Sequence, residues 1–396
     1  MSAILRLAAR GEGVAEDGRH VPLAAPGDRI GADGAVLPGP HHTTPACRHF
    51  PRCGGCQLQH VDNEAYAAYL VDRVAGALAA QGLDRPEIRA PHLSPPLSRR
   101  RASLRAERIG GRVVLGFNEG ASHRIVDIAE CPILHPALFA LVAPLRALLP
   151  PLIARRRTAE VRLALADQGV DLMLSGVEAE GLEASEALTA FAQAHRLARL
   201  SIDEGYGPSP RWEPEPVTVT LGGVAVALPA GVFLQATADG EAALLAAVEE
   251  AVGQASAIAD LFAGLGTFAL PLSARARVLA VEGARDPLLA LKQAAARAGR
   301  PIATEHRDLF RRPLDSAELG RFEAVVLDPP RAGAKEQMAA LATADIARIA
   351  YVSCNPATFA RDAARLAEGG WRIEWVRPIG QFRWSTHVEL AAAFAR

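Results

Sequence analysis

A single cysteine stands directly behind a strand-like stretch near the carboxyl end of the chain. Apolar, β-branched and aromatic residues run from 348 to 353, Cys354 follows, and Asn355-Pro356 stops the strand. The carboxyl end of a strand is the usual ligand edge of an open α/β sheet, and a thiol there can act as a nucleophile. A cysteine in a buried strand can also be a small apolar filler. We expect Cys354 to be the nucleophile.

The elements around Cys354 predict a doubly wound α/β domain over residues 230–396. Strand-like and helix-like patterns alternate regularly there, which is typical of a Rossmann-like sheet with helices on both faces. A helix is expected over 285–298, between the second and third strands. Seven strands are expected: 258–262, 277–281, a short one before Asp308, 322–327, the cysteine strand, 371–376 and 388–394.

Three features of this domain indicate a site for one adenosine moiety. Two glycines, Gly264 and Gly266, follow the first strand, where the backbone must approach a ligand closely. Glu282 ends the second strand and can accept hydrogen bonds from ribose hydroxyls. The third glycine of a dinucleotide site is missing. Two prolines fix Asp328 at the site edge, and the combination resembles a class I methyltransferase.

The residue after the two prolines bears on the acceptor atom. Amide and amine methyltransferases of this fold typically carry an aromatic residue there, but this chain has Arg331. A ring carbon such as uracil C5 needs a thiolate to add at C6 before it can take a methyl group. A base must then remove the C5 proton, and Glu389 at the start of the last strand is the candidate. In isolation, an acid at this place is more often an exposed residue at the start of a strand than a catalytic base.

Four further cysteines have the spacing of a metal centre. Cys47, Cys53 and Cys56 form a C-x5-C-x2-C pattern, and Cys131 is followed at once by Pro132. Three local cysteines with a remote Cys-Pro is a ligation style of [4Fe–4S] proteins, and a site closed by four thiolates is more often structural than catalytic. Zinc remains the alternative because three histidines could substitute as ligands: His49, His60 and His135.

The remaining sequence divides into two regions before the α/β domain. Residues 1–46 contain short apolar pieces and Gly-rich turns, and they resemble a shortened TRAM domain, a small RNA-binding β-barrel; an arm with two turns is the alternative. Residues 47–229 are expected to form a central α+β domain with the cluster loop. Its arginine-rich stretches, 99–112 and 155–162, suggest a nucleic-acid contact or a solvated surface.

Bulk composition adds limits. The chain of 396 residues is too long for one ordinary core, so two or three domains are expected. Its net charge of −1 gives no global sign of a polyanionic partner. It has no run of about 18 uncharged apolar residues and no signal-peptide pattern, so we expect a cytoplasmic protein without a membrane span. The cysteines then indicate metal binding or catalysis before disulfides.

The motifs together resemble the RNA uracil-5 methyltransferase family. They are Cys-x5-Cys-Gly-Gly-Cys-x-x-Gln, Phe233-Leu-Gln235, Asp260-Leu-Phe-Ala-Gly-Leu-Gly-Thr-Phe268, Leu327-Asp-Pro-Pro-Arg-Ala-Gly333, Tyr351-Val-Ser-Cys-Asn-Pro-Ala-Thr-Phe-Ala-Arg-Asp362 and His387-Val-Glu389. The cysteines favour the 23S ribosomal RNA branch with a [4Fe–4S] cluster held by Cys47, Cys53, Cys56 and Cys131. The resemblance implies a monomeric enzyme that uses S-adenosylmethionine.

The resemblance also implies roles for individual residues. Cys354 would be the nucleophile, Glu389 the base, and Arg331 a substrate contact. Contacts to S-adenosylmethionine would come from Gln235, Phe262, Thr267, Glu282, Asp308 and Asp328. Ala263, Thr237, Thr267 and Asp308 depart from residues common in the family, which weakens individual cofactor contacts. The alternatives are a transfer RNA uracil-5 methyltransferase, a non-catalytic Fe–S RNA-binding factor, and a methyltransferase acting on nitrogen or protein.

Overall fold

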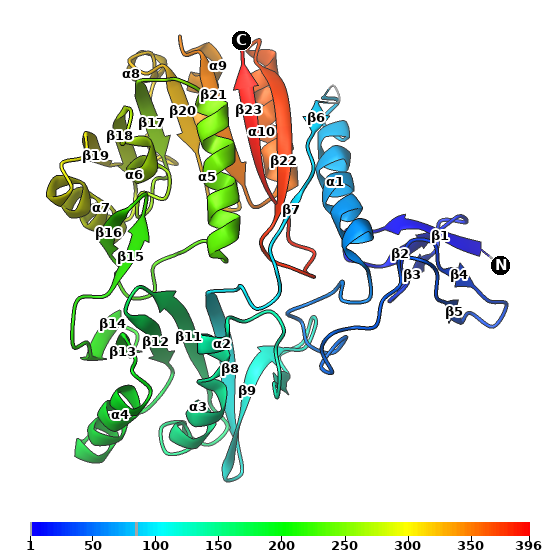
Figure 1. The fold of residues 1–396 in the computed structure, drawn as a ribbon, viewed down its shortest axis with the longest axis vertical. Coiled ribbons are helices and arrows are strands. Elements are labelled where there is room, and N and C mark those ends of the chain that lie inside the picture. Colours follow the sequence, from blue (N-terminus) through cyan, green and yellow to red (C-terminus); the bar gives the residue numbers. More distant parts are fainter. Residues whose placement is uncertain (1, 84–85) are drawn as a thin grey trace.

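A computed structural model describes residues 2–83 and 86–396 and shows three sheets, with a separate hairpin between two of them (Figure 1). The smallest sheet has the order β3-β2-β1-β4-β5 and lies beside the lower end of α1. Its small core consists of Ile4, Ala15, Ala24 and Ile30. Its strands are β1 Ser2–Leu7, β2 Gly13–Ala15, β3 His20–Val21, β4 Arg29–Ile30 and β5 Val36–Leu37.

The central sheet has seven strands in the order β10-β9-β8-β11-β12-β13-β14. The expected turn at Gly110-Gly111 joins β8 to β9, which pair antiparallel from Arg105↔Gly116 to Ile109↔Arg112. The strands are β8 Arg101–Ile109, β9 Arg112–Asn118, β10 Ile125–Asp127, β11 Thr158–Ala166, β12 Gly169–Ser175, β13 Arg199–Asp203 and β14 Pro208–Trp212. Three helices accompany this sheet: α2 Pro136–Phe139, α3 Val142–Leu148 and α4 Leu182–Ala194.

The third sheet contains the seven strands expected near the carboxyl end and two short strands from earlier in the chain. Its order is β19-β18-β17-β20-β21-β23-β22-β6, with β7 also pairing with β22. The strands are β6 Glu87–Ile88, β7 His92–Leu93, β17 Ala257–Leu261, β18 Arg277–Glu282, β19 Ile302–His306, β20 Ala324–Leu327, β21 Arg348–Ser353, β22 Arg372–Gly380 and β23 Glu389–Ala395. The first five of the carboxyl-terminal strands are parallel, and β23 runs antiparallel between β21 and β22.

Apolar side chains alternate between the two faces of this sheet, so each face packs against its own layer of helices. In β20, Ala324 and Val326 contribute to one core, and Val325 and Leu327 to the other, because successive strand side chains point to opposite faces. One layer contains the hairpin β15 Thr218–Leu221 with β16 Val224–Ala227, and α5 Ala238–Val252, α6 Ala269–Leu272 and α7 Arg285–Arg297. The other contains α1 Asn63–Ala79, α8 Ser316–Leu319, α9 Lys335–Thr343 and α10 Pro356–Glu368.

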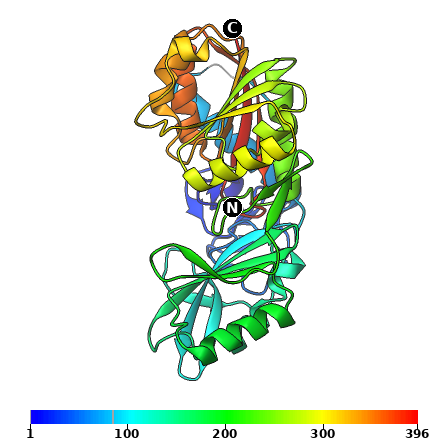
Figure 2. The same ribbon diagram turned by 90° about the vertical axis from the view of Figure 1, so that its left-hand side faces the viewer.

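Helix α1 and strands β6 and β7 lie within the predicted central region, yet they complete the layers of the third sheet. Tyr66 and Leu70 of α1 belong to the same core as β20 and α10, and β6 extends the sheet beside β22. Figures 1 and 2 show this α/β unit above the central sheet, with the small sheet to one side. Among the helices of residues 2–83 and 86–396, none is long and apolar enough to cross a membrane.

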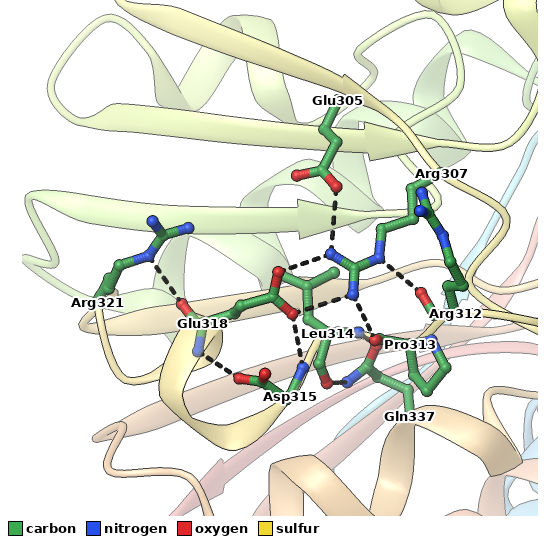
Figure 3. Close-up of polar contacts among 9 residues, drawn as sticks. All are labelled: Glu305, Arg307, Arg312, Pro313, Leu314, Asp315, Glu318, Arg321 and Gln337. Atoms are coloured by element: carbon green, nitrogen blue, oxygen red, sulfur yellow. Dashed lines mark hydrogen bonds and ion pairs between the residues drawn. The ribbon is translucent and has the colours of Figure 1, made fainter.

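The guanidinium group of Arg307 shapes the loop between β19 and β20, because all of its N–H donors are hydrogen-bonded (Figure 3). The Arg307 Nη1 and Nη2 atoms donate to the two carboxylate oxygens of Glu318 at 2.7 and 3.0 Å, and Nη1 also donates to Glu305. The remaining N–H groups donate to the carbonyl oxygens of Arg312 and Pro313, both at 2.7 Å. All five guanidinium donors are therefore used, and they close the loop over residues 308–313.

We expect Arg307→Lys to loosen this loop while leaving the sheet intact. Lysine keeps the charge near Glu318 but cannot reproduce the planar fork to two carbonyls and a carboxylate. Hydrogen exchange at the amides of 308–312 should accelerate by about tenfold or more, with a loss of unfolding free energy of about 1–3 kcal/mol. Arg311→Lys is the control, because the Arg311 side chain is 87% exposed and pairs only with Asp308. Equal exchange in the two variants would contradict this role for Arg307.

Candidate active site and cysteine cluster

A cavity of about 900 Å³ opens at the carboxyl edge of the third sheet. It receives side chains from the ends of β17, β18, β20 and β21, and from the segment that precedes α5. Eight of the residues predicted from the sequence line it together: Gln235, Phe262, Thr267, Glu282, Asp328, Arg331, Cys354 and Glu389. The structure thus brings the predicted nucleophile, base and adenosine-site residues to one place.

Cys354 is held between a strand end and a capped helix. Strand β21 ends at Ser353, and the Asn355 side chain accepts the Ala357 N–H at 3.1 Å to begin α10. The Asn355 side-chain amide and the Thr358 hydroxyl each donate to the Arg331 carbonyl at 3.2 Å. The start of α10 therefore ties the Pro-Pro-Arg loop to the segment that presents the thiol.

A buried carboxylate completes the attachment of that loop. Asp362 is 1% exposed, and its Oδ2 atom accepts the Ala334 N–H at 2.8 Å and the Tyr351 hydroxyl at 2.7 Å. Arg361 pairs with the same carboxylate and donates to the Ala332 carbonyl at 2.9 Å. One side chain of α10 thus fixes the loop and contacts the strand behind Cys354.

Burial sets the protonation of the reactive groups. It raises the pKa of Cys354 to about 11, helped by the negative charges of Glu389 and Asp328 and opposed by Arg331. Burial and the charge of Asp328 raise the pKa of Glu389 to about 8, and burial raises that of Asp328 to about 7. The free thiol is therefore protonated near neutral pH, while Glu389 is poised to accept or release a proton.

The glycine turn is built for close approach. Gly266 has a φ of +91°, and a Cβ there would meet Leu291 at 2.5 Å, so only glycine fits. The Glu282 carboxylate accepts the N–H groups of Gly264 and Ala284 at 2.9 and 2.7 Å, which holds the turn against the end of β18. Gln235 is 3% exposed and donates to Asp328 at 3.4 Å, which connects the incoming segment to the Asp-Pro-Pro edge.

Asp308 is the predicted cofactor residue that does not line the cavity. Its exposed carboxylate accepts the N–H groups of Phe310 and Arg311 at 3.0 and 3.3 Å and so closes a turn at the end of β19. The Phe310 ring lies 5.6 Å from the ring of Phe262, which does line the cavity. Asp308 therefore stands one residue layer behind the cavity wall, in the loop that Arg307 closes.

Several cavity residues were not predicted from the sequence as site residues, among them Arg101, Phe233, Phe382 and His387. The Arg101 guanidinium lies 4.5 Å from the centre of the Phe233 ring, and burial lowers the pKa of Arg101 to about 10. Arg331 donates to Nδ1 of His387 at 2.6 Å. Phe233 and His387 stand within motifs that resemble the family, but only the fold brings Arg101 from the central sheet to this edge.

The predicted basic stretch 99–112 does not form one exposed patch. Arg99 lines the cysteine cavity, Arg100 pairs with Glu241, and Arg101 enters the candidate active site. Alternation along β8 and the turn before it sends neighbouring arginines in different directions. A single electrostatic footprint over this stretch was therefore the wrong expectation, while Arg155, Arg156 and Arg157 are exposed as expected.

The four remaining cysteines line one small cavity between the loop at 47–56 and the segment at 131. All are free thiols, and burial raises the pKa of each, that of Cys56 to about 12. Gly54 lets the loop pass close to β9, because a Cβ there would meet the Asn118 carbonyl at 2.8 Å. Within the described ranges, no three His, Cys, Asp or Glu side chains form a site for one metal ion.

The histidines considered as zinc ligands have other surroundings. His49 accepts the Ala129 N–H at 2.9 Å, and His135 accepts the Ala137 N–H at the start of α2. His60 stacks on Phe50 and does not line the cysteine cavity. The cysteine cavity is thus lined by the four thiols together with His49 and Glu130, whereas His60 and His135 lie outside its lining.

Comparisons with known proteins place these features in a family. Residues 225–396 match a model described as tRNA (Uracil-5-)-methyltransferase. An uncharacterized RNA methyltransferase of Zymomonas mobilis is 56% identical over the full length of both chains. The 23S rRNA (uracil(1939)-C(5))-methyltransferase of Chromohalobacter salexigens is 34% identical, over 98% of this chain and 87% of that protein.

A solved structure shares the fold. The Pyrococcus abyssi tRNA (uracil-54, C5)-methyltransferase in complex with S-adenosyl-L-homocysteine matches with a TM-score of 0.73 and 22% identity, over the full length of both chains. At this identity the likeness concerns the architecture. It agrees with the expected α/β domain at the carboxyl end and with the sheet at the amino end.

The pKa of Cys354 generates a prediction for its alkylation. The rate with iodoacetamide should rise about tenfold per pH unit from pH 7 until the pH nears 11, because only the thiolate reacts. Glu389 is charged above its pKa of about 8, so Glu389→Gln should accelerate alkylation above pH 8 and change little below it. Labelling of Cys354 is followed by peptide mass spectrometry, with Glu374→Gln on β22 as the control. A rate that is flat with pH would exclude a buried, acid-flanked thiol.

Proposed function

The chain belongs to the family of S-adenosylmethionine-dependent RNA uracil-5 methyltransferases. On this premise, we propose that it methylates C5 of a uridine in 23S ribosomal RNA through a covalent step on Cys354. The observation that carries the proposal is one cavity lined by Cys354, Glu389 and the glycine turn. The Chromohalobacter salexigens relative supports ribosomal RNA as the substrate. Transfer RNA is the second candidate, favoured by the name of the matching family model.

In the proposed mechanism the chain first makes C5 nucleophilic. The Cys354 thiol releases its proton to water, the thiolate sulfur bonds to C6, and the electron pair of the C5–C6 double bond moves toward C5 and the O4 carbonyl. Arg331 lies at the same cavity, and its positive charge favours both the thiolate and the developing oxyanion. S-adenosylmethionine, when bound, supplies the methyl group that C5 takes.

Glu389 then resolves the covalent adduct. Its carboxylate takes the C5 proton, the C5–C6 double bond re-forms, and the bond from sulfur to C6 breaks. Burial suits this task, because a base with a pKa of about 8 is strong enough to take the proton and can lose it again near neutral pH. Asp328 contributes to that pKa through its negative charge.

We propose that the methyl donor binds at the glycine turn. Gln235, Phe262, Thr267, Glu282 and Asp328 line the cavity and are the proposed contacts. Asp308 does not line the cavity and would act indirectly, by holding the turn that carries the Phe310 ring against Phe262. The uracil would bind at the same cavity, next to Cys354 and Glu389.

The target uridine must leave its stack to reach this cavity. Phe233 is 61% exposed although it lines the cavity, and the Arg101 guanidinium lies over its ring. An exposed aromatic ring beside a guanidinium plane is a stacking platform for an unpaired base. We propose that the flipped base stacks on Phe233 and Arg101.

We also propose that the enzyme acts as a cytoplasmic monomer.

We also propose that Cys47, Cys53, Cys56 and Cys131 hold a [4Fe–4S] cluster. The support is that the four thiols line one cavity, while the two other possible ligands there, His49 and Glu130, accept hydrogen bonds from the N–H groups of Ala129 and Arg48. A cluster with four protein thiolates has no open position, so its contribution would be to clip the loop at 47–56 onto the segment at 131. Arg99 lines the same cavity and directly precedes Arg100 and Arg101, which connects this clip to the active site.

Trapping with 5-fluorouridine RNA tests the covalent mechanism. Fluorine at C5 cannot be removed as a proton, so wild-type protein with S-adenosylmethionine should form an adduct that survives denaturing electrophoresis. Cys354→Ala should form none. Glu389→Gln should accumulate the methylated adduct even on ordinary uridine RNA, with turnover reduced by about 100-fold or more. Glu374→Gln is the matched control and should behave as wild type. An adduct in Cys354→Ala would refute the assignment.

Metal analysis tests the cluster. Protein purified without oxygen should contain about four irons per chain and absorb visible light. Cys131→Ser should lose most of the iron and lower the melting temperature, because the remote segment is no longer attached. Cys354→Ser is the matched control and should keep the iron. One zinc and no iron in the wild type would rule out the cluster.

A further inference from the structure

A second hollow, of about 660 Å³, opens at the end of the third sheet that lies opposite Cys354. It is formed where β17 and β18 begin, by the β15–β16 turn, and by the segment after α7. Strand β17 alone has five residues and spans about 17 Å, so this hollow is remote from the candidate active site.

The charged residues that line this hollow are all arginines. Arg275, Arg277 and Arg300 line it, and Arg297 approaches it from the end of α7. In the described part of the chain none of these four arginines forms an ion pair within 4.0 Å, although many other arginines do. A local charge of this size stands out on a chain with a net charge of −1.

The guanidinium groups of these arginines are held in position, but few of their N–H donors form hydrogen bonds. Arg275, Arg297 and Arg300 each donate one long hydrogen bond, of 3.3 to 3.5 Å, to the carbonyls of Ala255, Ala225 and Gly222 respectively. Each guanidinium has five donors, so most of them remain open to a ligand. The nearby acid, Glu323, does not line the hollow and is bound to the N–H and hydroxyl of Ser256 at 2.8 Å.

The wall of the hollow is fixed by close packing. The β15–β16 turn packs closely against α6, because a Cβ at Gly222 would meet the Cα of Pro271 in that helix at 2.7 Å. Small residues such as Gly223, Ala274 and Gly299 line the hollow, so space for a ligand does not depend on large side chains moving. The arginines are therefore presented around a preformed opening.

We propose that this arginine groove binds the phosphodiester backbone of the RNA substrate, at a segment distant from the modified uridine. Guanidinium groups pair with phosphate oxygens through two parallel hydrogen bonds, whereas the lining lacks the aromatic and large apolar anchors of a protein interface. The inference rests on the proposed function, because it takes the substrate to be a structured RNA. A short hairpin that fills only the active site would not reach the groove.

Salt-dependent binding tests the groove. The triple variant Arg275→Gln, Arg277→Gln and Arg300→Gln is compared with wild type on a long 23S ribosomal RNA fragment and on a short hairpin carrying the same uridine. For the long fragment, Kd should rise at least about tenfold, and the slope of log K against log salt should fall by about 2 to 3, or about 0.9 per lost phosphate contact. Binding and methylation of the short hairpin should not change.

The matched control removes the same charge from the other half of the sheet. It combines Arg348→Gln, Arg365→Gln and Arg372→Gln, and circular dichroism verifies that both triple variants fold. The proposal is overturned if the groove variant binds the long fragment as tightly as wild type, or if the control variant loses as much affinity. Unchanged binding by the groove variant would leave an acidic protein as the partner of the groove. The groove and the proposed function can fail separately. If the triple variant has the smaller salt slope for the long fragment but the wild type methylates neither RNA, the groove is supported and the proposed function is refuted.

Discussion

Desolvation of negative charge at one sheet edge is the constraint on which the rest of this structure depends. Cys354, Glu389 and Asp328 line the same cavity, and burial is the largest cause of the raised pKa of each. Two arginines, Arg101 and Arg331, oppose that effect on Glu389. A thiol that stays protonated near neutral pH, beside a carboxyl group with a pKa of about 8, is the result of this balance.

The cavity is a product of chain segments that are distant in sequence. Glu389 begins β23 and Cys354 follows the neighbouring strand β21, whereas Arg101 comes from the central sheet and Gln235 from the segment between the two sheets. Helix α1 and strands β6 and β7 reinforce the same sheet from before the central region. A change in β6, β7 or α1 would therefore alter the sheet that carries the cavity without touching the motifs that line it.

Much of the α/β unit could be read from local patterns. The strands of the carboxyl-terminal sheet are short apolar runs closed by turn residues, and a strand end followed by Cys354, Asp328 or Glu282 places each side chain at the same edge. Local patterns could not identify Arg101, because it is one of three consecutive arginines. Arg99 lines the cysteine cavity, Arg100 pairs with Glu241, and Arg101 lines the candidate active site. The contributions of β6 and β7 escaped because two-residue strands have no periodicity.

The sequence by itself determined the residue types that could carry the chemistry and the edge of the sheet at which they appear. That information is local, since strand alternation and turn chemistry decide where a strand ends and which residue comes next. Only the tertiary structure decided which of those residues share a cavity, that Asp308 stands behind its wall, and that Arg101 completes it. Charge and burial depend on neighbours from distant segments, so protonation near Cys354 is set by the fold and not by the motif that contains it.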